Sequence, residues 1–258
     1  MAVLRKFTLP AKSLSSLPTG AVKDVVEQLG RHIVAGRYGF DQTMPTEAVL
    51  AIEFGVSRTV LREAVKVLSA KKMLRTARRY GTRVCHFEEW HLLDPDVIRW
   101  HGPDSPMAPR VYREATELRL IVEPEAAHLA ALHASQAQRQ TILEAASAIQ
   151  PEPFGLEAMI AADFTFHATI LEATGNVMLS QLHSLILALL QFSYPAGASA
   201  APDEKVSRER HIEVAKSIMA RDAGSAREQM RQMLYQNRAI ADRFGEERAA
   251  IASSLTSS

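Results

Sequence analysis

Residues 45–84 have the sequence PTEAVLAIEFGVSRTVLREAVKVLSAKKMLRTARRYGTRV. Within this stretch, apolar residues recur at helical spacing from Thr46 to Gly55 and again from Ser57 to about Lys72. Threonine and serine are favoured at helix starts because their hydroxyl oxygens accept hydrogen bonds from the free N–H groups of the first turn. We therefore predict two helices joined by a short turn after Gly55, which is the geometry of a helix-turn-helix.

The end of this stretch, from Leu74 to Val84, predicts a β-hairpin. Its sequence places Gly81 between two short runs that can pair with each other. A hairpin that directly follows a helix-turn-helix is the wing of a winged helix. Glycine in the wing lets the backbone approach a DNA duplex closely or reach its minor groove.

The second helix of the motif carries side chains suited to DNA. Arg58 and Arg62 are four residues apart and therefore share a helix face, and a guanidinium can donate two hydrogen bonds to O6 and N7 of guanine. Hydroxyl groups at helix starts can bind phosphates. The alternative is that the two arginines only make the surface soluble. The candidate DNA-binding residues are Thr46, Ser57, Arg58, Thr59, Arg62, Arg79, Tyr80 and Gly81.

Charge is distributed unevenly along the 258 residues. Residues 1–84 contain 15 Lys and Arg against 6 Asp and Glu, a net charge of +9, whereas residues 85–258 have a net charge of −8. This asymmetry is typical of a nucleic-acid-binding module joined to a domain with another task. No apolar run approaches the roughly 20 residues that span a bilayer, and the N-terminus lacks a signal-peptide pattern, so we expect a cytoplasmic protein. A single cysteine, Cys85, excludes an intrachain disulfide.

The whole chain is expected to be mainly α-helical, with a winged helix of three helices and a hairpin followed by a helical bundle. After the linker, almost every segment has helical periodicity, and no alternation of strands and helices occurs. The expected division is a flexible arm at 1–18, a DNA-binding domain at 19–85, a linker at 86–105, a helical effector-binding domain at 106–245 and a tail at 246–258.

A possible metal site lies in the acidic half. Asp163 and His167 are four residues apart, so on a helix they share a face and can bind one divalent cation. His211 lies near the start of a later helix. Mixed nitrogen and oxygen ligands suit zinc, nickel or manganese. Taken alone, this spacing is a weak signal for a metal and more often belongs to a polar pair that satisfies itself in the core or at the surface.

The 40-residue stretch from Pro45 resembles the winged helix of the GntR family. That resemblance implies that Arg58, Arg62 and the wing tip at Gly81 contact operator DNA. Two positions depart from the family pattern. Many members have arginine where this chain has Ala48, which removes an expected phosphate contact, and many have glycine where this chain has Lys72.

Residues 106–243 resemble the FCD ligand-binding domain of the FadR subfamily. The resemblance rests on LRLIVEP from Leu118, DFTFHATILEATGN from Asp163 and HIEVAKSIMARDAGSAREQM from His211. It implies that Asp163, His167 and His211 bind a metal inside a helical bundle. A further histidine is expected at the position of Met233, and a thioether is a poor ligand for hard divalent ions. A site with three protein ligands and metal-free sensing both remain open.

The same resemblance implies an effector site beside the metal. Arg119 is expected to grip the carboxylate of a small organic acid, since arginine binds carboxylates with two parallel bonds. A salt bridge to Glu123, four residues on, is the alternative. Asn237 is a candidate effector-binding residue by position. Ala48, Met233 and the linker together resemble sugar-acid regulators of the galactonate-operon type, which suggests an aldonate effector.

These features predict a homodimeric repressor that binds a pseudo-palindromic operator in double-stranded DNA and is released by a small carboxylate. No catalytic residues are expected. The rival class is a metal-dependent enzyme built on Asp163, His167 and His211, since catalytic metal sites also have three protein ligands and one open position. A metal-free sensor of another ligand, or a bundle that only binds partners, are the remaining alternatives.

Overall fold

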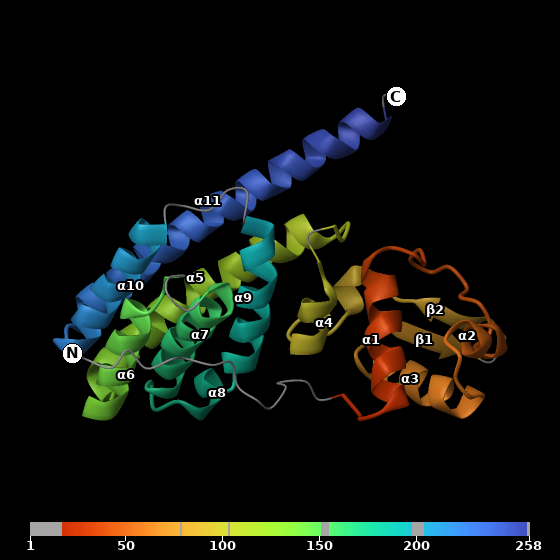
Figure 1. Ribbon diagram of the computed structural model, residues 1–258, viewed down its shortest axis with the longest axis horizontal. Helices are drawn as coiled ribbons and strands as arrows, with labels where there is room; N and C mark the ends of the chain where they lie inside the picture. Colours follow the sequence, from red (N-terminus) through yellow and green to blue (C-terminus); the bar gives the residue numbers. More distant parts are fainter. Residues whose placement is uncertain (1–16, 78, 103, 151–154, 198–203, 257–258) are drawn as a thin grey trace. The chain divides into compact units, whose positions relative to one another are not determined.

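The computed structural model describes residues 17–256 with four gaps (Figure 1). Nearly all of the arm expected at residues 1–18 lies outside this description. The described chain forms two compact units, residues 17–108 and residues 109–256. Both are mainly helical, which confirms the predicted fold class. The described ranges are 17–77, 79–102, 104–150, 155–197 and 204–256.

The N-terminal unit is a winged helix. Helices α1 and α3 pack on each other through fully buried residues such as Leu29 and Leu61, and α2 packs on α3. Burial of these side chains, each worth about 1.5–3 kcal/mol, accounts for the apolar spacing seen in the sequence. Its elements are α1 (Ala21–Val34), α2 (Glu47–Glu53), α3 (Arg58–Ala70), β1 (Leu74–Ala77), β2 (Gly81–Val84), the 3-10 turn η1 (Phe87–Glu89) and α4 (Pro95–Trp100).

The predicted wing is present as an antiparallel hairpin of β1 and β2. Leu74 pairs with Val84 at its base and Ala77 with Gly81 at its tip. Gly81 has φ +71°, a backbone conformation that residues with a Cβ rarely adopt. The base of the hairpin is buried in the core of the unit, while the tip is exposed to solvent.

Residues 86–105, which the sequence suggested as a linker, pack within the N-terminal unit. Trp90 and Trp100 are both buried there. Trp100 lies so close to α1 that a Cβ on Gly30 would come within 2.7 Å of its ring, so glycine is required at that position. The two large aromatic side chains remove apolar area from water, which explains why this segment is not an extended connection.

Polar contacts reinforce the packing of this segment. The buried ammonium of Lys71, at the end of α3, donates to Asp94 at 2.6 Å and to Asp96 at 3.0 Å. His101 is buried as well, and its Nδ1 lies 2.9 Å from the hydroxyl of Ser105. Helix α4 is therefore held to the DNA-binding unit by an ion-pair network as well as by tryptophan.

The C-terminal unit is a helical bundle. Helix α6 packs between α7 and α10, α10 packs on α11, and α9 contacts both α7 and α11 (Figure 1). Among the described residues, no helix is both long and apolar enough to cross a membrane. The elements are α5 (Ala108–His133), α6 (Gln136–Ser147), α7 (Leu156–Glu172), α8 (Val177–Ser180), α9 (His183–Gly197), α10 (Glu204–Met219) and α11 (Ala223–Thr256).

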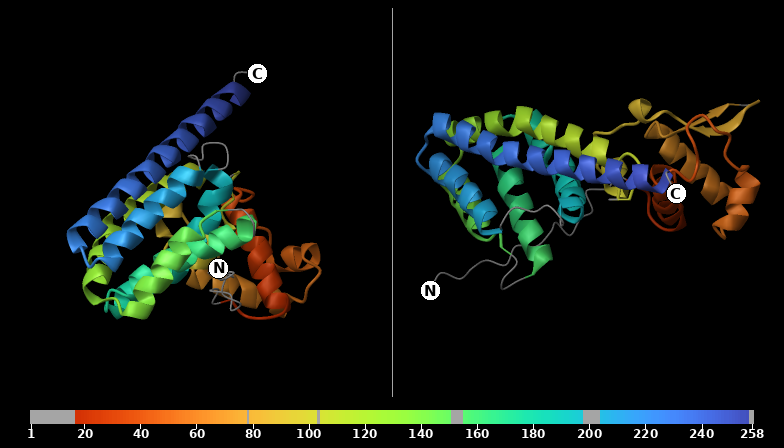
Figure 2. Two further views of the ribbon diagram at one scale, coloured as in Figure 1. Left: turned by 60° about the vertical axis from the view of Figure 1, so that its left-hand side comes forward. Right: turned by 90° about the horizontal axis from the view of Figure 1, so that it is seen from above.

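Helices α5 and α11 are antiparallel neighbours and lie side by side in Figures 1 and 2. Tyr112 near the start of α5 packs edge-on against Phe244 of α11, at 5.9 Å between ring centroids. Helix α11 continues to Thr256, so most of the segment expected to form a tail at 246–258 is helical. Pro124 lies inside α5, directly after the buried Glu123.

Candidate nucleic-acid interface and metal centre

Helix α3 has one buried face and one polar face. Leu61, Ala64 and Leu68 point into the core, whereas Arg58, Thr59 and Arg62 are exposed to solvent. The side chain of Arg62 is 62% exposed. This placement leaves both guanidinium groups accessible to a duplex, as a base-reading role requires.

The two predicted helix caps are present. The hydroxyl oxygen of Thr46 accepts from the N–H of Val49 at 3.4 Å, and that of Ser57 accepts from the N–H of Val60 at 3.3 Å. Each hydroxyl still has its own hydrogen to donate. Both exposed residues can therefore cap a helix and donate to a DNA phosphate at the same time.

An ion pair across the helix-turn-helix was not predicted from the sequence. Nε and Nη2 of Arg62 both donate to Oε2 of Glu47, at 3.2 and 3.0 Å. Glu47 is the first residue of α2, and Arg62 belongs to α3. Since the two residues are 15 positions apart, only the turn between the helices brings them together.

The wing presents a second set of exposed groups. Tyr80 is 64% exposed, and the guanidinium of Arg83 lies over its ring at 5.5 Å from the centroid. Arg79 and Gly81 are also exposed. Arg78 lies outside the described residues.

The structure explains one departure from the family pattern. Lys72 directly follows the cap residue of α3 and has φ +60°, the left-handed conformation that favours glycine. The backbone therefore makes a turn that glycine adopts without steric cost, whereas the side chain of Lys72 adds such a cost. Ala48 lies on α2 and is half-buried.

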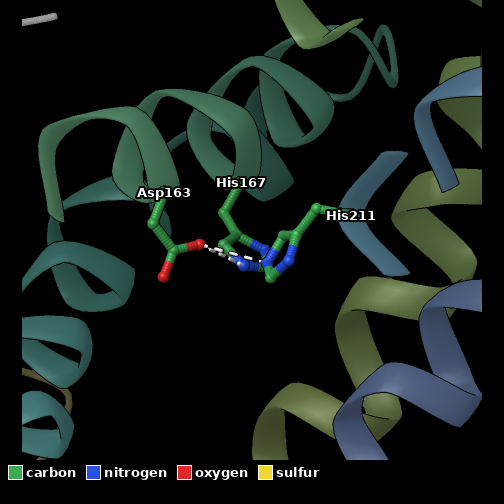
Figure 3. A group of neighbouring side chains, drawn as sticks. All are labelled: Asp163, His167 and His211. Atoms are coloured by element: carbon green, nitrogen blue, oxygen red, sulfur yellow. Dashed lines mark ion pairs between the residues drawn. The ribbon is translucent and has the colours of Figure 1, made fainter. Parts of the chain in front are cut away.

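The predicted metal ligands lie together in the C-terminal unit. Asp163 and His167 from α7 and His211 from α10 point toward one another (Figure 3), and all three are buried. Oδ1 of Asp163 lies 3.2 Å from Nε2 of His167 and 3.3 Å from Nε2 of His211. The three donor atoms lie within 4.8 Å of one another.

Neighbouring groups determine which ring nitrogens can bind a cation. Nδ1 of His211 lies 2.8 Å from the carbonyl oxygen of Ser207, so this nitrogen donates and Nε2 has the lone pair. Nδ1 of His167 lies 2.5 Å from Oε2 of Glu123, although the two atoms are poorly aligned for a hydrogen bond. With a proton on each Nδ1, both Nε2 lone pairs face the Asp163 carboxylate.

Arg119 and Glu123, one turn apart on α5, complete the cluster. Nε of Arg119 donates to Oε1 of Glu123 at 2.5 Å, so the salt bridge considered as an alternative is present. Nη2 of Arg119 also lies 3.1 Å from Nε2 of His167. Arg119 therefore contacts the metal-ligand cluster directly.

The pKa values in the cluster reflect mutual pairing. Burial raises the pKa of Glu123, but the charges of Arg119 and His167 outweigh it and lower the pKa to about 2. Burial likewise opposes ionisation of Asp163, yet His167 and His211 hold the pKa of Asp163 well below its usual range. A metal ion bound through the two Nε2 lone pairs would require neutral imidazoles, and one arginine with two carboxylates would then leave a buried net charge of −1 to balance the cation.

The donor set fits a divalent metal ion. Bonds of about 2.0–2.2 Å to nitrogen and oxygen place neighbouring donors about 3.0–3.5 Å apart, the range of the Asp163–His167 and Asp163–His211 distances. Met233 is buried on α11 and supplies no such donor. Asn237 is half-buried one turn later, and its side chain makes no hydrogen bond within the described part of the chain.

Both units match known protein families. Residues 21–84 match bacterial regulatory proteins of the gntR family, and residues 114–236 match the FCD domain. Among solved structures, Lar of Listeria monocytogenes, described as controlling the expression of the agr system, has a TM-score of 0.64 at 16% identity. The match covers 88% of this chain and 99% of that chain, and it supports the fold alone.

Relatives are similar to this chain over most of their length. The galactonate operon transcriptional repressor of Escherichia coli K12 is 33% identical over 64% of this chain and 72% of its own length. The uncharacterized HTH-type regulator YieP of the same strain is 30% identical over 78% and 87%. The repressor NanR of Escherichia coli K12 is 26% identical over 94% and 90%. These relatives are regulators, so the metal-dependent enzyme is not favoured. The chain belongs to the GntR family of bacterial regulatory proteins, and it is a DNA-binding transcription regulator with a C-terminal FCD domain.

Proposed function

We propose that this protein is a homodimeric repressor of a sugar-acid catabolic operon and that a small carboxylate, such as an aldonate, releases it from its operator. In this role the protein acts in the cytoplasm, and the exposed face of α3 reads one half-site per protomer. The effector binds in the FCD domain. The similarity to the galactonate operon repressor supports this effector class.

The observation that carries the effector proposal is the buried position of Arg119 beside the Asp163–His167–His211 cluster. A buried guanidinium is a strong, two-pronged partner for a carboxylate. A metal ion held by the three ligands would supply further positive charge for the same acid. Asn237 is proposed to bind an effector hydroxyl.

DNA contacts are proposed for the exposed residues of the winged helix. Arg58 and Arg62 would bind base edges, and the hydroxyl groups and the wing would bind the backbone and the adjacent groove. The proposed set is Thr46, Ser57, Arg58, Thr59, Arg62, Arg79, Tyr80 and Gly81.

A gel-shift titration on the promoter DNA next to the gene tests the proposal. The protein should bind at low salt as a dimer, and an aldonate should weaken the complex, whereas the same sugar with an aldehyde in place of the carboxylate should not. Arg119→Gln should retain operator binding and lose the response to the aldonate. Binding that no carboxylate changes would contradict the effector role, and no binding at any neighbouring promoter would contradict operator recognition.

A further inference from the structure

One nitrogen atom of the buried cluster has two competing partners. Nε2 of His167 lies 3.1 Å from Nη2 of Arg119 and 3.2 Å from Oδ1 of Asp163. A guanidinium N–H can only donate, so this contact uses the lone pair of Nε2 as its acceptor. A metal ion bound by His167 needs the same lone pair. The contact with Arg119 and metal ligation therefore exclude each other.

Glu123 makes this competition unavoidable. Its Oε2 lies 2.5 Å from Nδ1 of His167 and blocks the approach of a metal ion to that nitrogen, so Nε2 is the nitrogen of that ring left for a cation. Its Oε1 accepts from Nε of Arg119 at 2.5 Å. One buried carboxylate thus orients the imidazole and holds the guanidinium next to it.

We infer that Arg119 is a built-in competitor of the metal ion. In the metal-free cluster its guanidinium covers the lone pair of His167, and metal binding displaces it and frees its Nη groups. Nε can stay on Glu123, so the freed edge can donate two parallel bonds to a carboxylate. This second step rests on the proposed effector role of Arg119. Metal binding then increases affinity for the acid, although Arg119 itself weakens metal binding.

The sign of this effect distinguishes the inference from a simpler role. If Arg119 served only the effector, its removal would leave metal affinity unchanged. Arg119 is a buried positive charge in contact with His167, one of the metal ligands. Its removal takes away the N–H group that competes for the lone pair of His167, and it also takes away the charge that repels a divalent cation. Loss of Arg119 should therefore strengthen metal binding while it abolishes the response to the acid.

Zinc affinity of the full chain, measured by competition with a chromophoric chelator, tests the inference. Arg119→Gln keeps an N–H donor for Glu123 and should bind zinc at least tenfold more tightly than the wild type. Arg119→Lys keeps the charge but cannot cover Glu123 and His167 together, so its affinity should be intermediate. Arg113→Gln, an exposed arginine on the same helix, is the matched control and should bind zinc like the wild type.

Circular dichroism establishes which variants fold. If Arg119→Gln does not fold, the zinc affinity of Arg119→Lys tests the inference in its place. Equal or weaker zinc binding by the folded variant overturns the inference, as does the absence of zinc binding in every protein. In both cases a gel shift that still responds to an aldonate leaves the proposed function standing. Tighter zinc binding by the variant in a protein that ignores every carboxylate supports the competition and contradicts the proposed effector instead.

Discussion

In the N-terminal unit, Arg58 and Arg62 lie on the surface, and the ion pair of Arg62 with Glu47 is open to water. In the C-terminal unit, Arg119 and its partners are almost completely buried. Under the proposed function, the difference follows from the size of what each unit binds. A DNA duplex cannot enter a protein, so arginine side chains that bind it must lie on the surface. A small ion or acid can be enclosed in the interior, where electrostatic interactions are stronger.

This comparison predicts that removal of a charge affects binding in one unit and folding in the other. Exposed ion pairs contribute about 0–1 kcal/mol, since water screens them and the side chains lose freedom. Breaking a buried pair costs about 3–5 kcal/mol, since the remaining charge stays in the interior. The following substitutions are arranged from the largest expected effect to the smallest.

Glu123→Ala should have the largest effect on stability. It leaves Arg119 buried without its carboxylate, so the free energy of unfolding of the C-terminal unit should fall by about 3–5 kcal/mol. Urea unfolding followed by circular dichroism measures this loss. Glu114→Ala on the same helix is the matched control, because its pair with Arg110 is exposed and should contribute at most about 1 kcal/mol. Similar losses in both variants would refute the contrast.

His101 tests whether the N-terminal unit also depends on a buried titratable group. Burial lowers the pKa of His101 to about 4 from 6.5, so the folded unit resists a proton that the unfolded chain accepts. Stability is therefore complete above about pH 6.5 and should fall by up to about 3 kcal/mol as the pH drops toward 4. Both tryptophans lie in this unit, so their fluorescence during urea unfolding at pH 5 and pH 7 reports it alone.

His101→Gln is the control for this pH dependence. The amide can still donate to Ser105 but does not titrate, so the loss of stability between pH 6.5 and 4 should largely disappear. An identical pH profile in wild type and variant would show that other groups cause it.

Arg62→Ala should have the opposite profile to Glu123→Ala. Specific operator binding should weaken by about 1–3 kcal/mol, while unfolding changes by no more than about 1 kcal/mol. Fluorescence anisotropy with operator and scrambled DNA separates specific from non-specific binding. Arg113→Ala, which removes an exposed charge from the other unit, is the control and should leave both affinities unchanged. If Arg62→Ala lowers stability but does not weaken specific binding, Arg62 lies outside the interface.

The smallest expected effect concerns backbone conformation instead of charge. Lys72→Gly should stabilise the N-terminal unit by about 1 kcal/mol, because glycine adopts φ +60° without steric cost. Lys66→Gly, in the middle of α3, should destabilise it by about 1 kcal/mol. Thermal unfolding followed by tryptophan fluorescence compares the two. Shifts of the same sign would contradict the steric argument.

The sequence was sufficient where structure depends on local patterns. Thr46 and Ser57 indicated helix starts through their capping hydroxyls, and Gly81 indicated the wing through its conformational freedom. The spacing of Asp163 and His167 predicted a shared helix face. Each of these patterns involves only a few neighbouring residues, so it can be identified without knowledge of the tertiary structure.

Contacts that depend on packing between distant segments could not be predicted from the sequence. The Arg62–Glu47 pair needs two helices to cross, and the contact of Glu123 with His167 needs α5 to pack near α7. Helix α6 lacks a regular apolar pattern, since it buries Arg139 and small alanines beside Ile142. The linker prediction at residues 86–105 relied on its turn-like Asp94-Pro95-Asp96, whereas Trp90 and Trp100 anchor it in the core.

Pro124 gives α5 a point at which the helix can bend. Proline has no backbone N–H, so the carbonyl of Leu120 loses its helical partner and the rod bends there at a lower energetic cost. Arg119 and Glu123 lie on one side of this weak point, and the tightly packed Ala126 and Ala127 lie on the other. Movement of the guanidinium can therefore tilt the first half of α5 while its second half stays anchored.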